Sequence, residues 1–250
     1  MKDKALWKFI LILVICTIGG GIVGGVVAGT ENSIRDMGDA LNDTLIQLPP
    51  VLIPAIGALF ILLFFAFYIK ASRGFKTLDV DNEDVFETIE RQLSIAVAMT
   101  TVGTILLFIM IGIMSANIGA YSTLAFTVMT ALFIFFILFF AFMQRKVINF
   151  EKILNPEKKG DALNLNFQKE WFESCDEYEK MAAYKACYKS YKALQMGFMF
   201  VFVGVTILGT VFKIGILTHI TVGGLWLLHS LTYLVECVKE SKGKSVGGIF

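Results

Sequence analysis

The chain has 250 residues, of which 56% are hydrophobic and only 17% are charged, and its mean hydropathy is +0.70. These values lie outside the range of a soluble globular domain of this length and indicate a protein embedded in a lipid bilayer. The net charge of +1 provides no overall field that would recruit nucleic acid, so we expect no nucleic-acid partner.

Six stretches contain the run of about 20 apolar residues that is needed to cross the hydrocarbon layer. We predict an all-α polytopic membrane protein, a single domain with a polar insert at 144–195. The predicted spans are residues 7–30, 49–69, 93–115, 121–143, 196–212 and 214–235. Lys213 separates the last two spans, and because a lysine at the bilayer centre costs about 3 kcal/mol, it predicts a turn at the surface. The first stretch is too long for a cleaved signal peptide, so we expect an uncleaved anchor.

Basic residues are distributed unevenly among the loops. All but two of the 22 lysines and arginines fall on one side of the predicted spans, and the exceptions are Arg35 and Lys213. The positive-inside rule therefore places both termini and the 144–195 insert in the cytoplasm. The cysteines include no Cys-x-x-Cys pair, and we predict neither a disulfide framework nor a structural metal site.

The first predicted span is rich in glycine. The glycines at small-xxx-small spacing are Gly20, Gly21, Gly24, Gly25 and Gly29. This spacing lets two helix backbones approach closely in lipid, and we expect packing against another helix of the same chain. A homo-oligomer seam remains the alternative. A phosphate-binding loop is excluded because the glycines lie in a span and no lysine follows them.

The loop at 31–50 has apolar residues at helical spacing and predicts a short helix on the outer membrane surface. Pro49 and Pro50 should end it and begin the second span. The next span contains ALFILLFFAF (58–67), and the fourth span contains the related ALFIFFILFFAF (131–142). Both stretches exit towards the cytoplasm. Each is followed by basic residues and then by an acidic helical segment. A duplicated helical hairpin is one explanation of this agreement. The other is chance similarity between two apolar segments of a membrane chain that is rich in phenylalanine.

An acidic loop follows the second span. Asp79-Val80-Asp81 has the form of a paired-carboxylate site for a divalent ion, but such triplets arise easily in acidic loops. We instead expect Asp81 or Asn82 to cap the next helix, whose acids suit its N-terminal dipole. No metal or other cofactor is predicted.

The insert carries an aromatic seam that predicts one continuous helix over 167–195, about 42 Å long. Its members, at a mean spacing of 3.5, are Phe167, Trp171, Cys175, Tyr178, Met181, Tyr184, Tyr188, Tyr191 and Gln195. Acids precede lysines along it, as the helix dipole favours. The segment is either a structural stalk or a docking site for a cytoplasmic protein through Trp171 and the acidic cluster.

The stretch WFESCDEYEKMAAYKACYKSYK (171–192), placed before the last two spans of a six-span chain, resembles the bacterial membrane-protein family called domain of unknown function 3169. The resemblance is carried by Trp171, Asp176, Glu177, Glu179, Lys180, Tyr184, Ala186, Tyr188 and Lys189. Tyr178 stands where glycine is common in that family. The resemblance implies a multi-pass protein of the bacterial cytoplasmic membrane and no established activity. We take as candidate partner-binding residues Trp171, Asp176, Glu177, Glu179, Lys180, Tyr184 and Tyr188.

No catalytic signature supports an enzyme. The two histidines, His219 and His229, lie in the last span and do not share a face, so a joint metal site would need ligands from other spans. We predict a non-enzymatic membrane protein that acts by interaction, as a sensor, immunity factor or accessory subunit. The alternative is a permease subunit of an ATP-driven exporter, partnered by an ATPase subunit, or a small transporter with polar residues such as Thr100 and Asn117 at its site.

Overall fold

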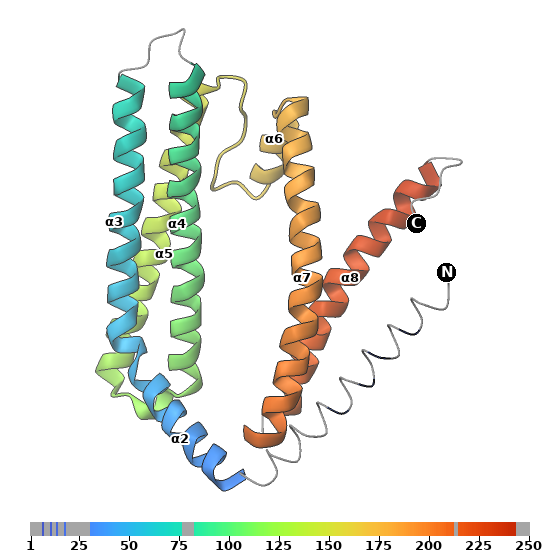
Figure 1. Cartoon of the computed structure of the whole chain (residues 1–250). Coiled ribbons are helices and arrows are strands. Elements are labelled where there is room, and N and C mark those ends of the chain that lie inside the picture. Colours follow the sequence, from blue (N-terminus) through green and yellow to red (C-terminus); the bar gives the residue numbers. More distant parts are fainter. Residues whose placement is uncertain are drawn as a thin grey trace. The chain divides into compact units, whose positions relative to one another are not determined.

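A computed structural model of the chain describes residues 31–76, 83–212 and 215–243, together with Trp7, Leu11, Val14 and Ile18. Apart from these four, the described residues form seven α-helices and one short 3-10 helix, without a strand among them (Figure 1). The helices are α2 (Glu31–Gln47), α3 (Pro49–Lys76), α4 (Glu83–Ala116), η1 (Ile118–Ala120), α5 (Thr123–Leu154), α6 (Phe167–Glu173), α7 (Glu177–Phe212) and α8 (Ile216–Gly243). The predicted all-α class is confirmed.

Five of these helices are long and apolar enough to cross a membrane: α3, α5, and the segments Val85–Ala116, Glu177–Gly209 and Ile216–Lys239 of α4, α7 and α8. Their outward apolar side chains are largely exposed, as lipid-facing residues would be. By length and composition these five helices are candidate membrane spans, and they indicate a membrane protein. The predicted first span lies outside the described residues except for four isolated positions, and its five glycines and Lys213 are not among the described residues. The prediction of six spans therefore stays a prediction.

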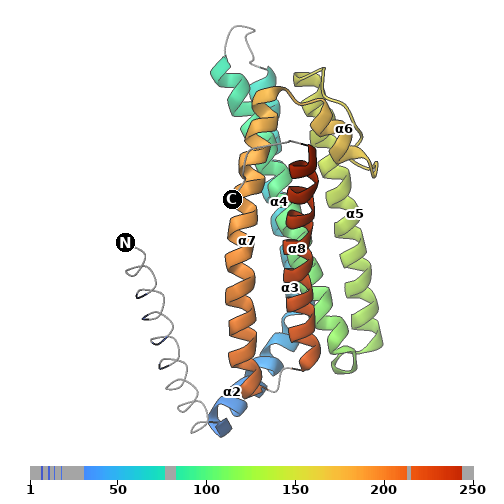
Figure 2. The same cartoon turned by 90° about the vertical axis from the view of Figure 1, so that its right-hand side faces the viewer.

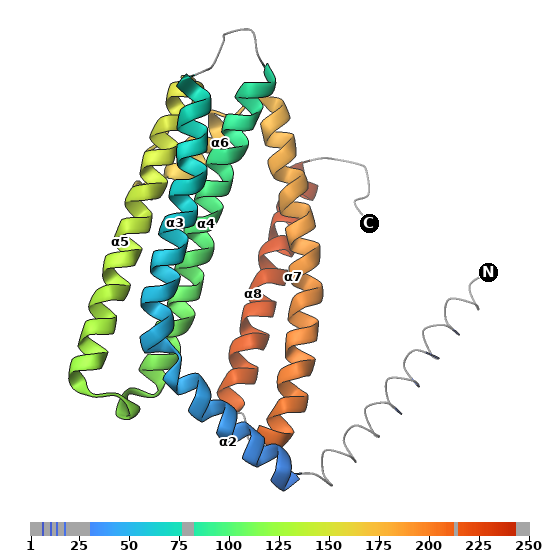
Figure 3. The same cartoon turned by 60° about the vertical axis from the view of Figure 1, so that its left-hand side comes forward.

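The chain divides into two compact units, and the first is Leu41–Met181. Helices α3, α4 and α5 run side by side in it, with α4 antiparallel to the other two (Figures 1 and 3). Inward residues recur every three or four positions, as expected for packed helices. The buried core includes Ile53, Phe60, Phe64, Ile89, Leu93, Leu107, Phe136, Phe140 and Val147. Gly57 is buried against Phe136, where a Cβ atom would overlap the ring, so α3 and α5 approach closely there.

The segment before this bundle is helical, as its periodicity predicts. Helix α2 ends at Gln47 and α3 begins at Pro49, so proline occupies the first turn of α3, where its missing N–H costs no hydrogen bond. The Tyr121 hydroxyl donates a hydrogen bond to the Ile46 carbonyl and ties the end of α2 to the turn between α4 and α5. The predicted caps Asp81 and Asn82 lie outside the described residues, although α4 begins directly after them at Glu83.

The two phenylalanine-rich stretches lie on α3 and α5, which run parallel to each other. Aligning their shared Leu-Phe-Phe-Ala-Phe ending would pair Phe64 with Phe139. The buried residue of α5 is instead Phe140, one position further on. Phe60 and Phe136 are also both buried, and Phe136 likewise lies one position beyond the residue that the alignment pairs with Phe60. The core positions thus match only after a shift of one residue relative to the shared letters. Duplication of the hairpin stays a hypothesis.

The second unit comprises Met1–Ala40 and Ala182–Phe250, and its described part is mainly the antiparallel pair α7 and α8 (Figure 2). Aromatic side chains hold this pair together. The ring of Tyr191 stacks on Tyr233 at 4.2 Å and on His229 at 4.8 Å between centroids. Further along, Phe202 meets the rings of Trp226 at 6.2 Å and His219 at 6.1 Å. Both histidines are thus packed against aromatic rings.

Candidate functional site

The end of the first unit where α5 stops carries a dense set of charged side chains, which we call the charged end. The apolar part of α5 finishes at Met143, and the helix continues to Leu154 through Arg145, Lys146 and Glu151. Asn155 caps it, and its side-chain amide donates a hydrogen bond of 2.7 Å to the Glu90 carboxylate of α4. This bond ties the end of α5 to the beginning of α4.

Lys158 is the central residue of the charged end. Its side chain is only 3% exposed, although it lies in a turn only a few residues beyond α5. The ammonium group donates hydrogen bonds to the Glu179 carboxylate and, at 3.6 Å, to Sγ of Cys175. It also lies 5.8 Å from the centroid of the Trp171 ring, which completes a cation–π contact. A buried cation needs such partners because burial without them is costly.

Glu179 belongs at the same time to the beginning of α7. The Glu179 backbone N–H donates to the Asp176 carboxylate at 2.7 Å, and the Asp176 N–H donates to the Glu179 carboxylate at 2.9 Å. This reciprocal pair is a capping box with Asp176 at the cap position. Lys158 therefore connects the turn after α5 to a helix start that is already fixed by its own hydrogen bonds.

The remainder of the turn is held by polar contacts to α5. Arg145 forms an ion pair of 2.6 Å with Asp161, and Lys152 donates a hydrogen bond to the Gly160 carbonyl. Gly160 has a φ of 104°, a conformation that other residues rarely adopt. The pKa of Asp161 lies below its ordinary value because it accepts a hydrogen bond from the Leu163 backbone N–H and another from Arg145.

Two further groups of the charged end have shifted pKa values. Burial acts to lower the pKa of Lys158, but the hydrogen bond and negative charge of Glu179 outweigh it and raise this pKa. Glu151 lies two turns beyond the apolar part of α5. Burial, assisted by the nearby charges of Glu90 and Glu179 and opposed by Lys158, raises the pKa of Glu151 to about 7. Glu151 thus changes its charge near neutral pH.

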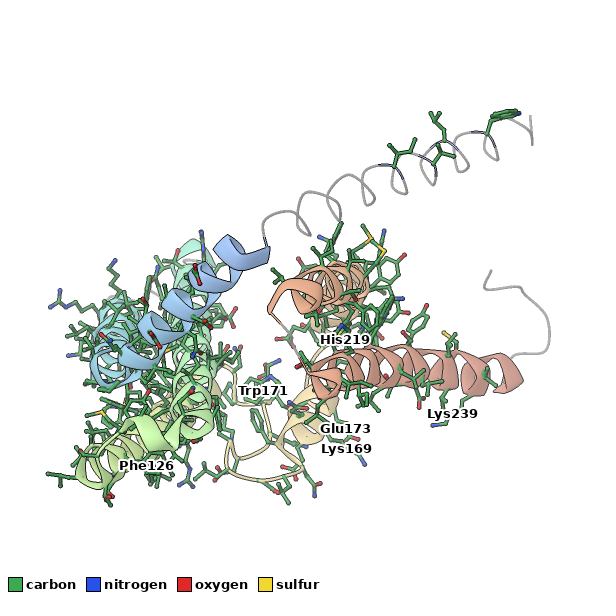
Figure 4. The ribbon with its side chains drawn as sticks, turned by 90° about the horizontal axis from the view of Figure 1, so that it is seen from below. Phe126, Lys169, Trp171, Glu173, His219 and Lys239 are labelled. Atoms are coloured by element: carbon green, nitrogen blue, oxygen red, sulfur yellow. The ribbon has the colours of Figure 1, made fainter. Side chains whose placement is uncertain are left out.

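The same segment also exposes apolar side chains. Leu165, in the loop before α6, is fully exposed, and Tyr178 on α7 is 83% exposed. Leu163 is 53% exposed, although its backbone is fixed by Asp161. These three residues form what we call the exposed apolar set. On α6, Lys169 and Glu173 lie on the opposite side of the helix from Trp171 and pair weakly at 3.8 Å (Figure 4).

A family model matches residues 4–237 of the chain, and it is described as protein of unknown function DUF3169. The chain belongs to this family. The resemblance predicted from 171–192 is thereby confirmed. Comparisons with curated proteins and with solved structures give no match.

Some of the residues that carry the DUF3169 resemblance are bonded to other parts of the chain, and others extend to the surface of α7. Trp171, Asp176 and Glu179 are engaged within the chain, through Lys158 and the capping box. Glu177 is exposed in the first turn of α7, and Lys180 reaches the Glu173 carbonyl at 3.5 Å. Tyr184 and Tyr188 lie further along α7 and are both 58% exposed. A partner role for these seven residues stays a prediction.

The prediction of one continuous helix over 167–195 is wrong. The helix ends at Glu173 and a new one begins at Glu177. The Ser174 hydroxyl donates to the Trp171 carbonyl at 2.7 Å and accepts the Lys159 N–H at 3.1 Å, which ends α6, and the capping box then starts α7. Helix α7 continues without interruption through residue 195 into the predicted fifth span. The 3.5-residue spacing of the aromatic seam does not detect this break.

Sequence reasoning missed Lys158, Asn155, Glu90 and Glu151. The Asp-x-x-Glu spacing of Asp176 and Glu179 is a readable capping signal and would have indicated the helix start. Nothing in the sequence marks Lys158, because a lysine beside Pro156, Lys159 and Gly160 is typical of a solvated turn.

Polar side chains on the bundle helices bond to each other or to the backbone. The Gln144 amide donates to the hydroxyls of Thr100 at 3.0 Å and Thr101 at 3.4 Å, and Thr100 is fully buried. The Asn117 amide donates to the Ile113 carbonyl at 2.9 Å. In the second unit, Glu236 pairs with Lys239 at 2.6 Å. Among the described residues, no group of His, Cys, Asp and Glu is arranged to hold a metal ion.

Proposed function

We propose that this DUF3169 protein is a non-enzymatic protein of the bacterial cytoplasmic membrane that acts by binding another protein at its charged end. The observation that carries the proposal is the exposed apolar set, Leu163, Leu165 and Tyr178, on a segment that buried Lys158 ties to Glu179 of α7. Pre-ordered apolar side chains beyond the membrane spans favour protein binding, because their ordering entropy has already been lost before a partner arrives.

The proposed orientation places the charged end in the cytoplasm. In the Leu41–Met181 unit the lysines and arginines follow the apolar part of α3, precede the apolar part of α4 or follow the apolar part of α5. These positions all lie at the same end of the bundle, because α4 is antiparallel to its neighbours. Concentration of cations at one end supports a cytoplasmic location for that end and for both termini.

Orientation is tested by cysteine accessibility on intact cells, in a background without other reactive thiols. A cysteine at exposed Asp39 should react with an impermeant maleimide on intact cells. A cysteine at exposed Lys159 should react only after lysis. The reverse result would refute the proposed orientation.

Partner binding is tested by photo-crosslinking in the native bacterium. A benzophenone amino acid at Leu165 or Tyr178 should give the same protein adduct, and one at Ile118, which is 58% exposed at the opposite end of the bundle, should give none. Lys158→Met should abolish the adduct from Leu165, because the loop would lose its attachment to α7. Equal adducts at Ile118, or no protein adduct at Leu165 and Tyr178, would contradict the proposal.

The identity of the crosslinked protein separates the proposed function from its alternative. A regulatory protein, or another membrane protein that the chain assists or protects against, would support the sensor, accessory or immunity role. An ATPase subunit would instead support a permease of an ATP-driven exporter, with the charged end as its coupling surface.

A further inference from the structure

A second feature of the charged end is a groove between α3 and α5. The proposal that the charged end binds another protein does not depend on this groove. It is lined by Tyr68, Ser72 and Phe75 from α3 and by Lys146, Asn149, Phe150 and Ile153 from α5, with a volume of about 310 Å³. Edge-on ring contacts of Phe150 with Phe75 at 5.3 Å and with Tyr68 at 5.9 Å form its apolar base. The groove therefore lies between two helix ends that are already packed together.

The groove presents a positive charge beside neutral polar groups. The Lys146 ammonium lies 4.9 Å from the centroid of the Tyr68 ring, which holds it over the α3 side. Lys146 is exposed, and no ion pair to it is present among the described residues, whereas its neighbour Arg145 is paired with Asp161. The Ser72 hydroxyl and the Asn149 amide add hydrogen-bond donors, and among the described residues no acidic side chain lines the groove. This chemistry matches an anion.

The depth of the groove matches the headgroup layer of a bilayer. The apolar run of α3 ends at Ile69 and that of α5 ends at Met143, so we expect Tyr68 and Lys146 to lie where the two helices leave the hydrocarbon. Tyrosine favours this level. The lining on α3 runs from Tyr68 to Phe75, a rise of about 10 Å, so the groove begins at the level of the headgroup layer and extends towards the aqueous side.

We propose that this groove binds the phosphate of an anionic phospholipid headgroup. Lys146 supplies the charge, Ser72 and Asn149 donate hydrogen bonds, and the acyl chains lie along the exposed apolar surface below. Basic pockets between helix ends are an established way of holding such headgroups. The volume is at the lower end of the range of ligand pockets, which fits a headgroup rather than a whole lipid.

The test is native mass spectrometry of the full-length protein released from mild detergent with phosphatidylglycerol or phosphatidylcholine added. The wild type should retain one phosphatidylglycerol in preference to phosphatidylcholine. Lys146→Gln should weaken this binding about fivefold, the factor that corresponds to about 1 kcal/mol for one lysine at an anionic surface. Ser72→Ala should weaken it by a smaller factor.

Lys70→Gln is the matched control. Lys70 lies at the same end of α3, 5.5 Å from the Phe67 ring, but it lines a different groove, between α3 and α4. It should change phosphatidylglycerol binding less than about twofold. Equal losses for the two lysines would show diffuse surface attraction and overturn the proposal, as would the absence of a preference for phosphatidylglycerol. Complete displacement of the lipid by inorganic phosphate would assign the groove to a soluble phosphate compound instead.

Discussion

The clearest prediction concerns the ion pair that fixes the charged end, and the perturbation is Glu179→Gln. A glutamine at this position retains the hydrogen bond to the Asp176 N–H, since Glu and Gln both serve in a capping box. The substitution therefore removes the negative charge opposite Lys158 and leaves the cap in place. Cys175 at 3.6 Å and the Trp171 ring remain as the other partners of the ammonium group.

The magnitude follows from the burial of the two side chains. Removing one partner from a fully buried pair costs about 3–5 kcal/mol. Here Lys158 is 3% exposed but Glu179 is 39% exposed, so water can reach part of the pair and we expect about 2 kcal/mol. This free energy corresponds to an opening equilibrium about 30-fold more favourable.

The assay is amide hydrogen exchange of the full-length protein in lipid nanodiscs, followed over residues 155–181. The control is Glu173→Gln, which breaks the exposed Lys169–Glu173 pair of 3.8 Å, with side chains 77% and 64% exposed. It should accelerate exchange about twofold at most. If Glu179→Gln and the control had equal effects, the buried pair would not hold the segment, and the reasoning would be refuted.

Three further predictions follow from the same structure. Since the pKa of Glu151 is about 7, the folded state binds a proton that the unfolded state releases, so local stability should fall by roughly 3 kcal/mol as pH rises from about 4.5 to above 7. Hydrogen exchange between about pH 5 and 8, corrected for intrinsic rates, should show this fall, and Glu151→Gln should abolish it. Gly57→Ala should destabilise the bundle by about 1–3 kcal/mol through overlap with Phe136. Gly112→Ala, where a Cβ meets no atom within 4 Å, should leave the melting temperature in detergent unchanged or slightly higher. Asp176→Ala should cost about 1 kcal/mol, seen as exchange about fivefold faster in the first turn of α7; an unchanged rate would show that the cap contributes nothing.

The membrane helices were predictable because hydrocarbon imposes a strict rule on sequence. A span must be apolar for about 20 residues, so α3, α5 and their neighbours are recognised without knowledge of their contacts. Helix α2 was predictable for a related reason, since its apolar residues repeat with the helical period and Pro49 marks its end.

The charged end was not predictable to the same degree, because its structure depends on contacts between distant positions. Lys158 is buried only because the chain returns and places Trp171 and Glu179 around it. A repeat of apolar residues at helical spacing indicates one face of a helix. The repeat over 167–195 keeps this spacing even though the helix is interrupted for three residues between Glu173 and Glu177. The break between α6 and α7 follows from hydrogen bonds of Ser174 and Asp176, which compete locally with helix continuation.

Two lysines of the charged end show how surroundings decide the role of one residue type. Lys146 and Lys158 each lie over an aromatic ring, at 4.9 Å and 5.8 Å from its centroid. Lys158 has a carboxylate within hydrogen-bond reach and almost no contact with solvent, so its charge is used to hold the chain together. Lys146 is exposed beside neutral donors, in a groove for which the described part of the chain supplies no acidic side chain. Its charge therefore stays available to an anion from outside the protein. Replacing Lys146 should accordingly reduce ligand retention, whereas replacing Lys158 should reduce local stability.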